Sequence, residues 1–161
     1  MIPSEIAEAT LLNIRNTLAL YSVALDTKNY HLLEKVFAAD VECDYSAVTP
    51  HYPTITGLAT FLDRIDKVLK DKKTQHALST QTLDFEDDGK ICVAMTYFTA
   101  NTFSEREDGK LEHVSVFGWY DDRLLRGRDG EWRIKKRKVN TFVSFVLLCN
   151  LTPFDMVLIS F

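Results

Sequence analysis

The chain has 161 residues, 46% of them hydrophobic and 26% charged, which suits one globular domain with a buried core. Its formal net charge of −4 argues against nucleic acid as a partner, because binding to a phosphate backbone needs a positive surface. Cys43, Cys92 and Cys149 are widely spaced and form no CxxC motif, so neither a zinc site nor a disulfide framework is indicated. The N-terminus also lacks the basic and apolar regions of a signal peptide, and these features together favour a cytoplasmic location.

The first half of the sequence predicts helices. Ser4 is a suitable N-cap for the first helix, in which apolar residues recur at helical spacing from Leu11 to Leu25. Tyr21 lies on the buried stripe of this helix, so its hydroxyl needs a partner inside the protein or points into a cavity. Asp26 falls at the C-terminal end, where the helix dipole disfavours a carboxylate, and such local conflicts are sometimes functional.

Shorter elements complete this half. Residues 32–37 form the apolar face of a short helix, and residues 41–45 alternate like a strand. Residues 49–54 contain two prolines and predict a loop. A third helix over residues 58–69 follows Gly57.

The second half predicts four strands, over residues 76–85, 91–103, 113–125 and 132 to about 145, with an Asp-Gly turn in each connection. The expected fold is α+β: a curved antiparallel sheet, made of this four-strand meander plus one short strand, with three N-terminal helices that enclose a cone-shaped pocket. The basic run from Arg133 to Lys138 is interpreted as an exposed or edge strand rather than a nucleic-acid patch.

The domain is expected to cover residues 1–142, followed by an apolar tail over residues 143–161. Asn150, Pro153 and the charged Asp155 interrupt this tail too strongly for a membrane span. We interpret the tail as the end of the last strand, packed on the domain or on a partner chain, or as an extension that is not native to the fold, such as a translated intron.

The strands also suggest a pocket lining. Gly-rich phosphate loops, HExxH and GxSxG are all absent, so we expect neither a metal nor a nucleotide cofactor. Because side chains alternate between the faces of a strand, one face carries His76 and others carry sets of polar and aromatic residues. If these faces look into the cone, the pocket suits a small hydrophobic, oxygenated ligand, and its lining includes Tyr97, Asn101, Phe117, Trp119 and Asp121.

His76 is the candidate for chemistry, with Asp26 as its partner. A histidine beside a carboxylate in an apolar pocket is the usual general base, because the carboxylate fixes the tautomer and stabilises the imidazolium. A nearby tyrosine such as Tyr21 polarises a carbonyl or protonates a leaving hydroxyl. Together they suffice for proton abstraction next to a carbonyl, although each residue taken alone is more often structural.

Several short segments carry a family resemblance. The chain resembles the SnoaL-like branch of the NTF2-like superfamily, including scytalone dehydratase and bile-acid 7α-dehydratase. The matching segments are Tyr21–Asp26 with Lys28–Tyr30, Phe37–Val41, Thr74–His76, Gly118–Asp122 and Asp129–Ile134. The resemblance implies a cone-shaped fold, a cofactor-free active site and a homodimer formed through the sheet.

The resemblance also implies roles for residues. Asp26 and His76 match the supporting aspartate and the catalytic histidine of both enzymes, and Tyr21 matches the catalytic tyrosine of the bile-acid enzyme. Tyr45 matches a water-holding tyrosine of scytalone dehydratase, and Asn101 replaces a second histidine of that enzyme. Trp119 and Asp121 stand where scytalone dehydratase has a serine and an asparagine. Arg137 matches a substrate-side arginine of the bile-acid enzyme.

These observations favour a cofactor-free lyase or isomerase, similar to a dehydratase, that acts on a polycyclic polyketide, terpenoid or steroid-like intermediate. A polyketide cyclase would use the same His/Asp pair, since both reactions begin with the same proton abstraction. A non-catalytic binding module for a small molecule or a protein is the alternative from a different class.

Overall fold

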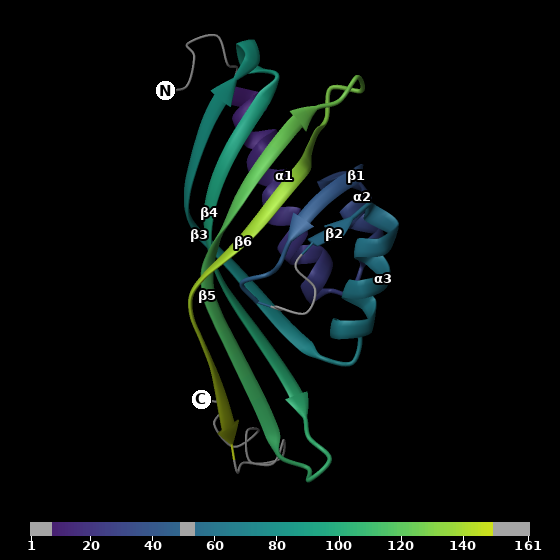
Figure 1. The fold of residues 1–161 in the computed structure, drawn as a ribbon, viewed down its shortest axis with the longest axis vertical. Coiled ribbons are helices and arrows are strands. Elements are labelled where there is room, and N and C mark those ends of the chain that lie inside the picture. Colours follow the sequence, from purple (N-terminus) through teal and green to yellow (C-terminus); the bar gives the residue numbers. More distant parts are fainter. Residues whose placement is uncertain (1–7, 49–53, 150–161) are drawn as a thin grey trace.

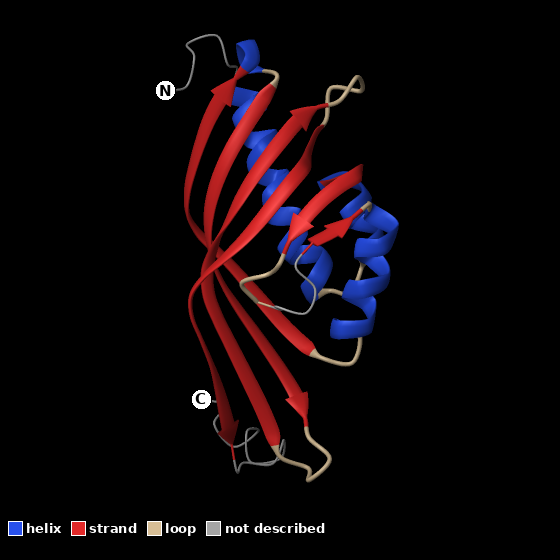
Figure 2. Cartoon of the chain, in the orientation of Figure 1, coloured by secondary structure: helices blue, strands red, loops and turns tan. Residues whose placement is uncertain are grey.

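The computed structural model describes residues 8–48 and 54–149 (Figures 1 and 2). The helices lie on one face of a strongly twisted sheet and leave its other face uncovered, which confirms the predicted α+β class. The elements in chain order are α1 (Glu8–Asp26), η1 (Tyr30–Leu32), α2 (Leu33–Val36), β1 (Phe37–Asp44), β2 (Thr54–Thr56), α3 (Leu58–Leu69), β3 (Lys73–Glu86), η2 (Asp87–Gly89), β4 (Ile91–Glu105), β5 (Leu111–Arg126) and β6 (Trp132–Cys149).

The sheet has the strand order β2-β1-β6-β5-β4-β3. Strands β3 to β6 form the expected antiparallel meander, but β1 runs parallel to β6, so the sheet is mixed rather than purely antiparallel. Strand β2 is an addition to the one short strand predicted outside the meander. Its three residues pair with β1 through backbone hydrogen bonds. Such pairing requires no particular side-chain pattern, so the sequence gives no sign of this strand.

The basic run of β6 lies inside the sheet, so its interpretation as an edge strand is wrong. β6 has β1 and β5 as neighbours, and carboxylates pair with four of the five cations in the run. The pairs are Arg133 with Asp129, Lys135 with Asp40, Lys136 with Glu42 and Arg137 with Asp122.

The core lies between α1 and the sheet. Ile14, Leu18 and Leu25 of α1 are at most 1% exposed and belong to the same buried cluster as Trp132 and Ile134 of β6. Burying the apolar stripe of α1 in this way fixes the direction in which its last turn, with Asp26, meets the sheet.

The long strands twist strongly along their length (Figure 1). β6 contains a bulge, since the pairing shifts by one residue between Phe117 and Gly118 of β5. A Cβ atom on Gly118 would lie 2.0 Å from the carbonyl oxygen of Asn140. Glycine at this position therefore lets two backbones approach closely where the sheet bends.

The expected boundary between domain and tail falls within β6, which continues through residues 143–149. The rest of the expected tail, residues 150–161, and the predicted N-cap Ser4 lie outside the described residues. Within the described part of the chain, no helix is long and apolar enough to cross a membrane.

Candidate active site

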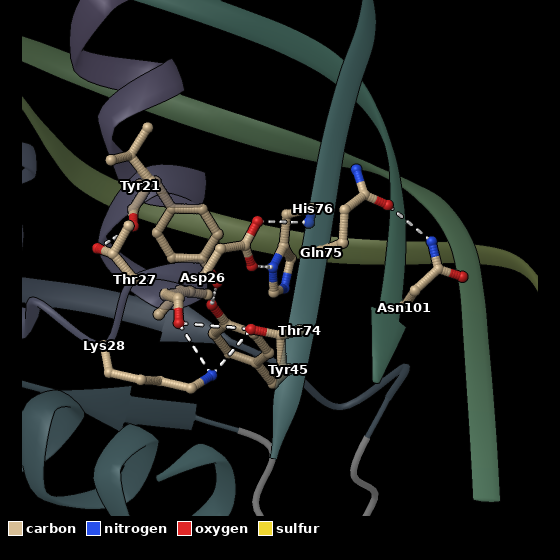
Figure 3. A network of polar contacts seen from close by, with 11 residues as sticks. Tyr21, Asp26, Thr27, Lys28, Tyr45, Thr74, Gln75, His76 and Asn101 are labelled. Carbon is tan, nitrogen blue, oxygen red and sulfur yellow. Dashed lines mark hydrogen bonds and ion pairs between the residues drawn. The ribbon is translucent and has the colours of Figure 1, made fainter. Parts of the chain in front are cut away.

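Asp26 and His76 form a doubly hydrogen-bonded pair between the last residue of α1 and the start of β3 (Figure 3). The Nδ1 atom of His76 donates to Oδ1 of Asp26 at 2.6 Å, and the backbone N–H of His76 donates to Oδ2 of Asp26 at 2.8 Å. The side chain of His76 is only 9% exposed. Because a carboxylate can only accept, the proton of the neutral imidazole sits on Nδ1, and Nε2 is left with a free lone pair.

A second cross-link holds α1 and β3 in this register. Lys28 adopts a left-handed conformation with φ of 59°, directly after the end of α1. Its Nζ atom donates to the carbonyl oxygen of Leu25 at 3.0 Å and to Oγ1 of Thr74 at 2.9 Å. Burial lowers the pKa of Lys28, and the charge of Asp26 opposes that shift. The ammonium thus satisfies a terminal helix carbonyl and ties it to the residue two positions before His76.

Tyr21 and Tyr45 place two phenol groups close to the imidazole. Their hydroxyl oxygens are 2.9 Å apart, and the ring centroids of Tyr21 and His76 are 6.2 Å apart. Burial raises the pKa of Tyr21 and raises that of Tyr45 well above its usual value. Both phenols therefore stay protonated at neutral pH. Because one of them donates to the oxygen of the other, at most one O–H of the pair is left to donate to a bound oxygen.

Tyr21, Tyr45 and His76 line a cavity of about 320 Å³. Its walls are mostly apolar: α1 and α3 provide one side, and the sheet provides the other. The sheet residues are Phe98, Ala100 and Thr102 of β4, Val114, Val116 and Tyr120 of β5, and Val139 of β6. A mostly apolar cavity with a few polar groups converging inside it is typical of small-molecule sites.

Five residues expected in this pocket lie on the opposite, uncovered face of the sheet, so their predicted placement is wrong. They are Tyr97, Asn101, Phe117, Trp119 and Asp121, and the neighbours of each in sequence face the cavity or the core beside it. Figure 3 shows Asn101 beyond β3, where its Nδ2 atom donates to Oε1 of Gln75 at 2.9 Å. Alternation shows which residues share a face, but both faces of this sheet carry aromatic residues, so composition alone did not show which face meets the helices.

The misplaced aromatic residues pack against one another. The rings of Tyr97 and Trp119 lie 5.4 Å and 4.7 Å from the ring of Phe142, between centroids. Phe117 contacts Phe145 in the same way, at 5.6 Å. These contacts cover part of the open face of the sheet rather than a ligand pocket.

Arg137 lies behind Tyr21 and is not among the residues that line the cavity. Two hydrogen bonds of 2.7 Å join its guanidinium to Asp122, and both side chains are at most 1% exposed. The guanidinium carbon stands 4.2 Å from the ring centroid of Tyr21 and 4.1 Å from that of Tyr120. Burial raises the pKa of Asp122 while Arg137 opposes that shift, and the two short bonds are those of an ionised pair.

Arg137 therefore acts on the site through Tyr21. Its positive charge opposes the rise that burial causes in the pKa of Tyr21. The cation also holds the phenol ring from behind by a cation–π contact.

The described residues contain no group of three or more His, Cys, Asp or Glu side chains arranged to hold a metal ion. Among them, the polar side chains that line the cavity are those of His76, Tyr21, Tyr45, Tyr120 and Thr102, with Arg64 on α3 and Lys72 after it. Sequence patterns missed these two cations, because their positions on α3 and after it also suit the solvent-exposed end of a helix.

The model of the SnoaL-like domain matches residues 9–138. No curated protein is significantly similar to the chain in sequence. Among solved structures, the Kfla4162 protein from Kribbella flavida is similar with a TM-score of 0.78 at 20% identity, over 87% of this chain and 95% of that chain.

Two further structures show the same fold. A proposed scytalone dehydratase from Novosphingobium aromaticivorans DSM 12444 has a TM-score of 0.71 at 21% identity, covering 85% of this chain and 87% of that one. The hexachlorocyclohexane dehydrochlorinase LinA-type3 from Novosphingobium barchaimii LL02 has a TM-score of 0.72 at 16% identity, covering 89% and 93%. At these identities the likeness concerns the fold alone.

Proposed function

Because the chain belongs to the SnoaL-like domain family of the NTF2-like superfamily, we propose that it is a cofactor-free lyase or isomerase that removes a proton next to a carbonyl group. One observation carries this proposal. The Asp26–His76 pair presents a free imidazole Nε2 at a mostly apolar cavity whose lining also includes two phenols. Two of the structural relatives are named a dehydratase and a dehydrochlorinase. Both names denote elimination reactions, which supports the lyase class.

The residues divide the work as follows. Nε2 of His76 takes the proton from carbon, and Asp26 stabilises the imidazolium that results. Tyr21 donates to the carbonyl oxygen as negative charge develops there, or protonates a departing hydroxyl, while Tyr45 holds its hydroxyl in place. Apolar walls keep water out and strengthen these interactions.

The substrate class follows from the cavity. With about 320 Å³ and aromatic and aliphatic walls, it suits a flat, hydrophobic, oxygenated molecule such as a polycyclic polyketide, terpenoid or steroid-like intermediate. A cyclase would use the same proton abstraction, and only the fate of the carbanion separates it from a dehydratase. A binding module has no need of a histidine whose imidazole and backbone N–H are each held by an oxygen of the same carboxylate.

The experiment that tests this function uses the compound that accumulates in a strain lacking the protein. Purified wild-type protein should convert that compound, and His76→Ala should lower kcat by roughly 10²–10⁴-fold. His31→Ala serves as the matched control, because His31 has a 94% exposed side chain and should leave kcat unchanged. A folded His76→Ala protein that turns over at the wild-type rate would show that His76 is not the base.

We also propose a homodimer formed through the uncovered face of the sheet, and a cytoplasmic location. Phe142 and Phe145 are 59% and 49% exposed on this side of the molecule, beside the aromatic cluster of Tyr97 and Trp119. Exposed aromatic groups of this size favour burial against a partner. Light scattering should give the mass of a dimer for the wild type and of a monomer for Phe142→Glu; Leu12→Glu, a similar change at an exposed position of α1, should stay dimeric.

The proposed cytoplasmic location rests on the thiols of two cysteines within the described residues. Cys43 and Cys92 are both free and buried. Such thiols persist most readily in a reducing compartment.

A further inference from the structure

The cavity that holds His76 has an uneven distribution of charge. Its wall includes two cationic side chains, Arg64 of α3 and Lys72 of the connection between α3 and β3. No aspartate or glutamate is among the described residues that line it, since Asp26 lies behind the imidazole. Lys72 thus brings positive charge to a wall on which the described residues include no carboxylate.

Lys72 is only half-buried, yet the groups around it in the cavity are largely apolar. Within residues 8–48 and 54–149 its ammonium group makes no hydrogen bond and no ion pair. A charged group with reduced access to water gains most from a partner of opposite charge, because apolar neighbours solvate it poorly.

The chain around Lys72 adds to this positive potential. Residues 64–73 contain five cationic side chains and two carboxylates, Asp66 and Asp71, although the net charge of the whole protein is −4. Lys67 is paired with Asp63 at 2.7 Å, but the other cations of this segment surround the cavity mouth and the adjoining hollow. Such a local excess attracts anions to the entrance.

The spacing from Lys72 to His76 sets a length. Residues 72–76 alternate between half-buried and exposed, so the side chains of Lys72 and His76 share the face that looks into the cavity. Lys72 lies in the bend just before β3, so its Cα atom is at most about 13 Å from that of His76, the span of four extended residues. A tricyclic ligand that reaches His76 with one end therefore brings its other end to Lys72.

We propose that Lys72, with Arg64 on the same wall, binds a carboxylate at the end of the substrate remote from the reacting carbon. This inference rests on the proposed function in that the bound molecule is taken to be the substrate. The substrate is then held at two polar ends, by the phenols and imidazole at one and by the ammonium at the other. Between them its rings pack on Phe98 and Val116.

The test measures binding rather than turnover, so that it can fail independently of the proposed reaction. Anthracene-2-carboxylate and its neutral carboxamide serve as fluorescent probes of equal shape. The wild type should bind the carboxylate about tenfold more tightly than the carboxamide, since charge-assisted hydrogen bonds outweigh neutral ones. Lys72→Gln should remove this preference by weakening binding of the carboxylate alone.

Three further variants make the result decisive. Lys90→Gln removes the same charge at an exposed position far along β3's hairpin and should keep the wild-type preference. Lys72→Glu should reverse the preference, and Val116→Trp, which fills the cavity, should abolish binding of both probes. The proposal would be overturned if the wild type bound the two probes equally or bound neither. It would also be overturned if Lys72→Gln kept the wild-type preference, or if Val116→Trp bound the probes fully.

The outcome for the reaction is read separately. If Lys72→Gln loses the preference while His76→Ala turns over normally, the carboxylate site stands and the acid–base mechanism falls. If His76→Ala is inactive but the probes bind alike, the mechanism stands and the carboxylate site falls.

Discussion

Tyr21 is the residue at which the polar contacts of the site meet. Its hydroxyl lies 2.9 Å from that of Tyr45, its ring covers the guanidinium of Arg137, and it lines the cavity beside His76. Burial raises its pKa more than Arg137 lowers it, so the folded protein keeps this phenol protonated up to and beyond pH 10. It is therefore a proton donor over the whole range in which a histidine base works.

Tyr21→Phe should lower kcat by roughly 10²-fold, because the variant retains the ring and loses only the donor. Ionisation of Tyr21 should not lower the rate at any pH below 10, because the raised pKa of Tyr21 keeps its hydroxyl protonated there. Tyr30→Phe is the matched control: the buried hydroxyl of Tyr30 has no partner among the described residues, and its loss should leave kcat unchanged. Steady-state kinetics across pH measures both, and wild-type kcat in Tyr21→Phe would remove this residue from the mechanism.

At the scale of the elements, the bend in β5 and β6 shapes the cavity. Gly118 lies beside the bulge in β6, and Phe98 of β4, its pairing partner, lines the cavity. The bulge beside Gly118 lets the long strands change direction, so the same sheet packs on α1 at one end and faces the cavity further along. A residue that no acid–base argument singles out thus determines the form of the pocket.

Gly118→Ala should destabilise the protein by at least about 2 kcal/mol, because its Cβ would meet the carbonyl oxygen of Asn140 and force two backbones apart. Gly109→Ala is the comparison: a Cβ there meets nothing within 4 Å, and only its positive φ of 76° carries a cost, of about 1 kcal/mol. Urea unfolding of both variants measures the difference. A smaller loss of unfolding free energy for Gly118→Ala than for Gly109→Ala would contradict the close approach of Gly118 to Asn140.

At the scale of the whole molecule, the interior holds several acidic groups in their neutral form. Burial raises the pKa of the Cys43 thiol, and that of Cys92, to about 12. In the unfolded chain these thiols titrate near 9.0. Between these values the unfolded state has already released protons that the folded state retains, so unfolding becomes easier as pH rises.

The free energy of unfolding should therefore fall steadily from pH 9 towards pH 12. Urea titrations at pH 8, 9, 10 and 11 measure the slope. In the double variant Cys43→Ala and Cys92→Ala the slope should be shallower, because the contribution of both thiols is lost while the buried tyrosines and Lys28 still titrate. An identical slope in both proteins would mean that the two thiols do not control alkaline stability.

The sequence by itself determined the order of the elements and the catalytic candidates. Helical spacing from Leu11 to Leu25 and three Asp-Gly turns suffice for helices followed by a meander, because these patterns are local. Tyr21, Asp26 and His76 were likewise identified from their types, their settings and the motifs around them. Tyr21 and His76 line one cavity, and Asp26 holds the imidazole from behind, which supports that prediction.

Only the tertiary structure decided which face of the sheet meets the helices. Alternation divides β4 and β5 into two sets, but aromatic residues occur in both, so Tyr97 and Trp119 suited a pocket as well as Phe98 and Tyr120 did. The choice depends on how α1 and α3 dock and where the sheet bends, and these are long-range contacts that no short window of sequence contains. For the same reason the place of Lys72 in the cavity wall depends on which face of the sheet meets the helices.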